Sequence, residues 1–356
     1  MARGLLASVV STALSYASCT AAWAQPIHEP PRVVLIDPAS IAPTRAPSTV
    51  SPLTVEAAPG PQGVERQTQS FVQTYAAAAN PELGQIARWH DGVCVQVVGL
   101  VAPDQAAKIA ARIEDVAKSL KLPVLPKGCQ SNIQIEFSNR PQDVLDRVAA
   151  RTEQVLGYHH PVTLKALKTV THPIQAWYMT ATRGGAGDIA ALAFASMGGS
   201  GAPSAAFTNQ QVKQEVIDAP ENHPPVGCAE SPHFTSCVKG VFKNVFMVAD
   251  SSLVQGKDSG AVADYMAMLA LSQPRSLDGC YALPSVIDLF AKTPCPRRDP
   301  PDGLTPADAA YLTALYSADM EANKAGEQGD IARRMAKILI TAHAVARADA
   351  EGADLR

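Results

Sequence analysis

The chain has 356 residues, 47% of them hydrophobic, and a formal net charge of -3 at pH 7. This nearly balanced charge excludes the strongly basic footprint of a nucleic-acid-binding protein, so we expect no nucleic acid among its partners. The length allows one large domain or two small ones.

The N-terminus has the three parts of a secretory signal peptide, residues 1–24. Arg3 precedes an apolar stretch from Leu5 to Leu14, and small residues follow up to Ala22-Trp23-Ala24. This order predicts cleavage after Ala24, which leaves Gln25 at the mature N-terminus. The apolar stretch is too short to span a bilayer, and no later segment has ~20 consecutive apolar residues, so we expect no transmembrane segment in the mature chain.

Cys19 offers a second interpretation of the N-terminus, a lipoprotein acylated at that cysteine. Tyr16 stands where a lipobox usually has leucine, which favours cleavage after Ala24 instead. We therefore predict a periplasmic or secreted protein, with anchoring at Cys19 as the alternative.

An even number of cysteines follows the signal peptide, which predicts three disulfides in an oxidising compartment. These are Cys94, Cys129, Cys228, Cys237, Cys280 and Cys295. Pairing in sequence order is the simplest of the permitted arrangements: Cys94 with Cys129, Cys228 with Cys237, and Cys280 with Cys295. Metal binding by these cysteines is disfavoured because the chain has no C-x-x-C motif, so we expect neither a metal nor another cofactor.

Residues 25–66 contain nine prolines, each of which removes a backbone donor and interrupts regular structure. This stretch predicts an extended arm or linker. We place the main domain at residues 67–356, with a long loop near 183–239 that is rich in glycine, alanine, serine and proline.

The main domain begins with alternating strand and helix patterns. The expected elements are a strand at 93–100, a helix at 103–120, a strand at 132–137, a helix at 141–155, strands at 174–181 and 241–248, a helix at 261–271, and helices at 305–318 and 325–350. Thr305-Pro306 followed by Asp308 is typical of a helix start. The order of elements predicts an α+β or layered α/β fold with a single main domain.

Motifs of common catalytic sites are incomplete in this chain. The glycine clusters 184–187 and 198–201 do not form a phosphate-binding loop, because no Gly-Lys-Ser or Gly-Lys-Thr follows them. Ser200 lacks the second glycine of a nucleophile elbow, since Ala202 stands there. Several histidines fall in turn or loop contexts and are expected at the surface or at caps: His159, His160, His172, His223 and His233.

Three C-terminal segments together resemble zincin-type metallopeptidases, most closely exported bacterial proteins related to them. Residues 263–271 have the apolar rhythm of the zincin active-site helix, which carries the motif H-E-x-x-H. Residues 283–288 and 304–316 resemble the "P-S-I-M/F" and "L-T-x-x-D…L…L-Y" segments that follow in that group. The resemblance implies a zincin-like mixed sheet covered by helices.

The residues that bind zinc in that group are missing here. Ala263, Ala267 and Gln273 stand at the three histidine positions, and Asp264 stands at the glutamate position. The resemblance therefore implies a non-catalytic scaffold without metal, which binds a partner protein or a small ligand in a vestigial cleft at these four residues. If the resemblance is accidental, the same residues are a core helix.

An enzyme remains the alternative function. An envelope hydrolase would need a site that sequence motifs do not reveal, and His223, His233 and Asp264 are its candidate residues. Clustering of these three side chains in one cleft would favour the enzyme, and wide separation would favour the binding protein.

Overall fold

The computed structural model describes residues 60–78, 85–151, 156–157, 165–184, 187–188, 238–296, 298–318 and 324–353. The expected signal peptide and the arm up to residue 59 lie outside this range. Helix α1 (Pro61–Tyr75) begins inside the stretch that we expected to be the arm. Pro61 stands at the first helical positions, where proline loses no hydrogen bond, so this proline starts a helix rather than interrupting one.

A five-stranded mixed sheet lies at the centre of the fold, in the order β1-β2-β5-β3-β4. The strands are β1 (Val95–Val98), β2 (Ile133–Ser138), β3 (Ile174–Gly184), β4 (Gly187–Asp188) and β5 (Val238–Asp250). β1, β2 and β5 run parallel, whereas β3 is antiparallel to β5 and β4 is antiparallel to β3. The fold is therefore α+β, as the sequence predicted. The ends of the expected 183–239 loop belong to β3, β4 and β5, and the rest of that loop lies outside the described residues.

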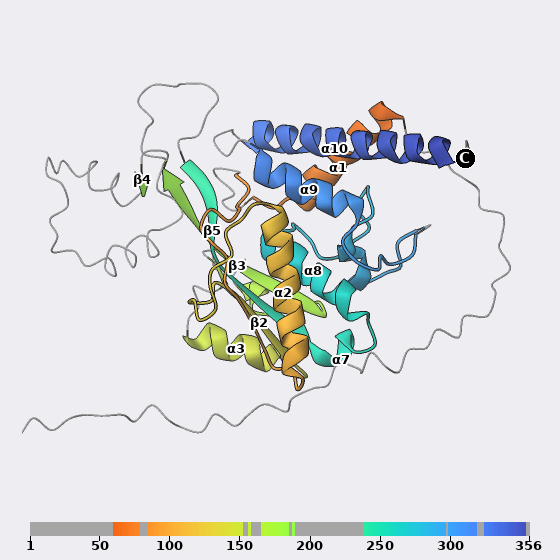
Figure 1. The fold of residues 1–356 in the computed structure, drawn as a ribbon. Coiled ribbons are helices and arrows are strands. Elements are labelled where there is room, and N and C mark those ends of the chain that lie inside the picture. The colour runs from red at the N-terminus through yellow and green to blue at the C-terminus, as the bar shows by residue number, and fades with distance from the viewer. Residues whose placement is uncertain are drawn as a thin grey trace, which may run out of the picture. The chain divides into compact units, whose positions relative to one another are not determined.

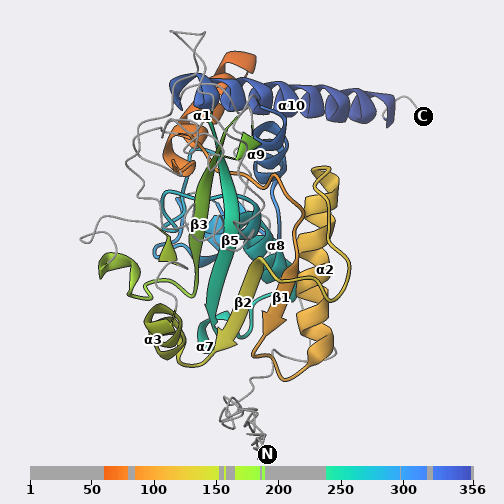
Figure 2. The same cartoon turned by 90° about the vertical axis from the view of Figure 1, so that its left-hand side faces the viewer.

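Helices cover both faces of the sheet (Figure 2). Helix α2 (Pro103–Ser119) and helix α8 (Ser259–Leu271) share a core with Val245 and Met247 of β5. Phe246, which points to the other face, packs in a second cluster with helix α3 (Pro141–Arg151). Successive residues of a strand point to opposite faces, so β5 serves both layers.

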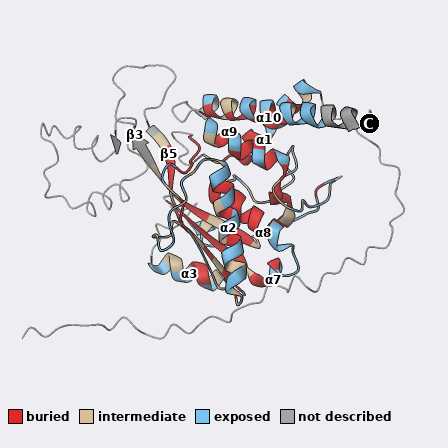
Figure 3. Ribbon diagram, in the orientation of Figure 1, coloured by how far each residue is buried: buried red, intermediate tan, exposed pale blue. Residues whose placement is uncertain are grey.

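Helix α8 lies in the middle of the larger core (Figure 3). Every residue from Ala261 to Leu271 is buried, and a helix that is apolar on all sides is expected in such a place. The four-residue helix α7 (Ser251–Val254) precedes it. Asp258 caps α8, since its side chain accepts a hydrogen bond from the Ala261 N–H at 2.9 Å.

The C-terminal elements are the 3-10 helix η3 (Val286–Phe290), which packs against α8, helix α9 (Pro306–Ser317) and helix α10 (Lys324–Ala353). Helices α9 and α10 form a further helical layer together with α1 (Figure 1). α10 packs against both α1 and α9. No described helix has the length and apolar composition needed to cross a membrane.

A buried ion pair connects the segment before β1 to α10. Arg88 and Glu327 are each 1% exposed, and their side chains form a salt bridge. The guanidinium also donates to the Ala318 carbonyl at 3.0 Å, and the second oxygen of Glu327 accepts from the Ile86 N–H at 2.8 Å. These contacts satisfy much of the buried charge and fix the segment against the C-terminal layer.

Two of the expected disulfides are present. Cys94 pairs with Cys129, and Cys280 pairs with Cys295, with Cα–Cα distances of 6.2 and 5.2 Å. The third expected pair, Cys228 with Cys237, lies outside the described residues. The first bond ties the residue before β1 to the loop before β2 and so holds two neighbouring strands together.

Candidate functional site

Asp264 is the only member of the expected vestigial cleft that carries a charge, and each oxygen of its carboxylate accepts a hydrogen bond. Its Oδ1 accepts a hydrogen bond from Arg112 Nε at 2.5 Å, and its Oδ2 accepts one from the Leu304 N–H at 3.0 Å. The residue is 7% exposed. Asp264 therefore joins α8 to α2 and to the loop before α9.

The loop before α9 approaches Asp264 closely. A Cβ atom placed on Gly303 would lie 2.6 Å from the Asp264 carboxylate. A glycine at this position lets the Leu304 N–H reach the carboxylate, because any larger residue would push the two segments apart.

The other three residues of the expected cleft offer little to a metal. Ala263 and Ala267 are 4% and 0% exposed and belong to the core. Their methyl groups carry no lone pair, so neither residue is a metal ligand. The Oε1 atom of Gln273 is buried without a hydrogen-bond partner among the described residues.

A hollow of about 310 Å³ opens beside the Asp264 contacts, between α2 and α9. Arg112 and Leu304, which both bind Asp264, line it. We call it the α2–α9 hollow. Its apolar lining includes Val116, Leu120, Leu304 and Leu312, and its polar lining includes Arg112, Asp115, Ser119 and Thr313.

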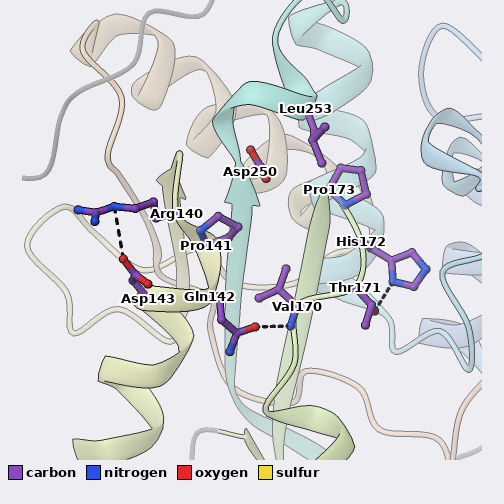
Figure 4. Close-up of a pocket in the computed structure, with 10 residues that line it drawn as sticks. All are labelled: Arg140, Pro141, Gln142, Asp143, Val170, Thr171, His172, Pro173, Asp250 and Leu253. Atoms are coloured by element: carbon purple, nitrogen blue, oxygen red, sulfur yellow. Dashed lines mark hydrogen bonds and ion pairs between the residues drawn. The ribbon is translucent and has the colours of Figure 1, made fainter.

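A second pocket, of about 430 Å³, lies where β2 and β5 end and β3 begins (Figure 4). We call it the His172 pocket. It is lined by residues 140–143, residues 170–173, Asp250 and Leu253. Gln142 bridges its two sides, because its Oε1 accepts from the Val170 N–H and its Nε2 donates to the Lys168 carbonyl, each at 2.9 Å.

A row of hydrogen-bonded polar side chains extends from the His172 pocket to the loop before η3. The Thr171 hydroxyl lies 2.8 Å from His172 Nδ1, and His172 Nε2 lies 3.4 Å from Asp278 Oδ1. Lys292 and Ser276 also bind Asp278, each at 2.8 Å. With its proton on Nε2, the imidazole donates to Asp278, and its Nδ1 can accept the Thr171 hydroxyl, whose one proton is also within reach of Gln175 Oε1 at 3.2 Å.

The ionisation states of His172 and Asp278 suit a neutral base next to a hydroxyl group. Burial lowers the pKa of His172, and the hydrogen bond to Asp278 opposes that effect only in part. The hydrogen bond from Lys292 is the largest of several that lower the pKa of Asp278, to about 2. At neutral pH the histidine is therefore neutral and the carboxylate is ionised, which is the arrangement of a general base with its orienting acid.

We did not predict this group of polar side chains from the sequence. We expected His172 at the surface or at a cap, whereas its side chain is 11% exposed. His172 and Asp278 are 106 residues apart, and no motif connects them. Of the residues that we named for a hydrolase, His223 and His233 lie outside the described residues, so their clustering with Asp264 stays a prediction, and Asp264 is bound to Arg112.

One cluster among the described residues has the spacing of a metal site. Ligand atoms of Cys280, Asp288 and Cys295 lie within 4.8 Å of one another. The two sulfur atoms are bonded to each other, so neither is a thiolate, and Asp288 accepts a hydrogen bond from the Cys280 N–H at 2.6 Å. This cluster is a disulfide-bonded turn rather than a candidate metal centre.

The chain matches no protein-family model, no curated protein and no solved structure.

Proposed function

We propose that the chain is an exported binding protein on a metallopeptidase-like scaffold, which performs no zinc chemistry at α8 and binds a partner or small ligand beside that helix. The observation that carries this proposal is the double engagement of Asp264. Both carboxylate oxygens accept hydrogen bonds, one from α2 and one from the loop before α9. A catalytic carboxylate needs an oxygen available to water or substrate.

The order of elements supports the scaffold. β1, α2 and β2 follow one another as strand, helix and strand, and α8 follows the sheet as the helix with the apolar rhythm of the zincin motif. The two disulfides support export, because such bonds persist in oxidising compartments. The α2–α9 hollow supports a binding role, since it adjoins Asp264 and falls in the size range of small-ligand sites.

Metal analysis and peptidase assays of the purified protein test the first half of the proposal. We expect no stoichiometric zinc and no metal-dependent cleavage of peptides. We expect Asp264→Ala to lower the free energy of unfolding by roughly 1–3 kcal/mol, because Arg112 and the Leu304 N–H lose their acceptor. Stoichiometric zinc that survives mild chelation and disappears in Asp264→Ala would refute the proposal.

Nuclear magnetic resonance of methyl-labelled protein tests the second half. A library of small fragments is titrated, and the methyl signals of Leu120, Leu304 and Leu312 report on the α2–α9 hollow. Binding beside α8 predicts that the largest shifts belong to these residues. Shifts confined to Val170 and Leu253 would move the site to the His172 pocket instead.

The contacts of Thr171 and Asp278 with His172 favour hydrolysis as the second candidate function. In such a reaction the Thr171 hydroxyl attacks an ester carbonyl while His172 takes its proton, and the proton then passes to the departing alcohol. Water releases the acyl group from the threonine in a second step. Hydrolysis of p-nitrophenyl acetate that is lost in Thr171→Val and kept in Thr171→Ser would support it, and equal rates in all three proteins would eliminate it.

A further inference from the structure

Arg112 lines the α2–α9 hollow and has hydrogen-bonding groups that no described residue uses. Its Nε binds Asp264, and its two terminal nitrogens have no hydrogen-bond partner among the described residues. The side chain is 46% exposed, in contrast to the 10% of the Asp264 side chain behind it. The guanidinium is thus bound to Asp264 through Nε, and the rest of the side chain is partly open to solvent.

Such an arginine is prepared to bind a carboxylate. The hydrogen bond that Arg112 donates to Asp264 restricts the guanidinium and raises its pKa further, and the group is always charged. The planar fork of an arginine binds a carboxylate through two parallel hydrogen bonds. Because the contact with Asp264 already restricts the Arg112 side chain, ordering that side chain costs less of the binding free energy of a ligand.

The remainder of the hollow is suited to an apolar body. Val116 and Leu120 contribute from α2, and Leu304 and Leu312 contribute from the α9 side. A volume of about 310 Å³ is at the lower end of small-ligand sites, which excludes large or branched molecules. The one carboxylate in the lining, that of Asp115, is paired with Lys118 Nζ at 3.1 Å.

We propose that the α2–α9 hollow binds a small amphipathic carboxylic acid. The terminal nitrogens of Arg112 bind the carboxylate, and a short apolar chain or a single ring lies against the leucine and valine side chains. This inference rests on the proposed function, because it names the chemical class of ligand for the same binding site.

Three probes of equal length and different head group test the proposal: octanoate, octanol and octylamine. They are titrated against the full mature protein while the methyl signals of Leu120, Leu304 and Leu312 are followed. We expect octanoate to bind at least tenfold more tightly than octanol, and octylamine to bind more weakly than either, because Arg112 repels an ammonium group.

Two variants assign the effect to Arg112. Arg112→Gln removes the fork, and we expect octanoate affinity to fall by about tenfold or more while octanol affinity stays the same. Thr313→Glu leaves the Arg112–Asp264 contact in place but puts a negative charge in the hollow, and it should weaken octanoate alone. Arg147→Gln is the matched control, since that exposed arginine binds Glu136 away from the hollow.

The possible results distinguish a failure of the carboxylate assignment from a failure of the proposed function. Equal binding of octanoate and octanol, unaffected by Arg112→Gln, would overturn the carboxylate assignment and keep the ligand site. No shift of the three methyl groups with any probe or fragment would overturn both. Tighter binding of a hexapeptide with a free C-terminal carboxylate would replace the small acid by a peptide and so overturn the assignment too.

Discussion

The hydroxyl of Ser285 donates a hydrogen bond to Asp308 Oδ1 at 2.6 Å, although the two residues belong to the starts of different helices. Ser285 caps η3 in a capping box with Asp288, and Thr305 caps α9 in a capping box with Asp308. Asp308 also accepts hydrogen bonds from the N–H groups of Val286 and Thr305. A single buried carboxylate thus fixes both helix starts, and burial raises its pKa to about 6.

We expect Ser285→Ala to lower the free energy of unfolding by roughly 1.5–3 kcal/mol, the range for a hydrogen bond to a charged group. Chemical denaturation at pH 7 measures the difference. Ser317→Ala is the control, because that serine is exposed and binds only the Ala314 carbonyl of its own helix, so its effect should stay within about 0.5 kcal/mol. Equal effects of the two substitutions would show that the shared carboxylate adds nothing.

Two glycines should respond to alanine with opposite signs. Gly303→Ala should destabilise by roughly 1–3 kcal/mol, because its Cβ would lie 2.6 Å from the Asp264 carboxylate. Gly329→Ala should stabilise by about 0.5–1 kcal/mol, because the site is open and lies inside α10, where glycine is unfavourable. Thermal unfolding of both variants provides the measurement, and a stable Gly303→Ala protein would contradict the close approach at Asp264.

Peptide mapping without reduction should recover Cys94 with Cys129 and Cys280 with Cys295. It should also recover Cys228 with Cys237, the pair that lies outside the described residues. The first two bonds close segments with sequence separations of 35 and 15. Replacing either pair by serine should cost about 3–4 kcal/mol, and the bond across the longer segment should matter more. Free thiols at any of these positions would refute the pairing.

The pH dependence of stability should contain a contribution from His172. Because burial lowers its pKa in the folded state, the neutral form is favoured there, and the stabilisation is complete above the unfolded value of 6.5. It is lost as the pH falls below that value. We expect His172→Gln to flatten the stability profile below about pH 6.5, whereas Thr171→Val, which keeps the imidazole, should not. A profile unchanged by His172→Gln would show that the imidazole is not buried in solution.

Export makes a separate prediction, since Ala22-Trp23-Ala24 has the form of a cleavage site. The mature protein recovered from the periplasm or medium should begin at Gln25. A mass that corresponds to an acylated N-terminal Cys19 would instead identify a lipoprotein.

The elements were predictable where the sequence has a period or a cap. Ile109, Ile113 and Val116 recur on one face of α2 and are buried, as expected. The alternation in β2 gives alternating burial, and Thr305-Pro306 starts α9. The start of α1 was missed because proline both interrupts helices and begins them, and only the fold distinguishes the two.

The contacts of the candidate sites depend on residues that are far apart in sequence. Each capping box is visible as a short motif, but the hydrogen bond between Ser285 and Asp308 spans 23 residues and leaves no signal. Arg112 and Asp264 are 152 residues apart, and neither segment indicates that the two side chains meet. Sequence patterns indicate local conformation, whereas these side-chain contacts depend on how α2, α8 and α9 pack.

The ion pair between Arg88 and Glu327 also affects the stage of synthesis at which the chain can complete its fold. The partner of Arg88 is 239 residues later in the sequence, so the segment before β1 lacks it until α10 is present. Before that moment, burial of the arginine would leave an uncompensated charge. A shorter, incomplete chain is therefore held back from its final packing. A protein exported in extended form, as we propose for this one, gains from such a delay, because α10 supplies the partner of Arg88 only after the sheet has been synthesised.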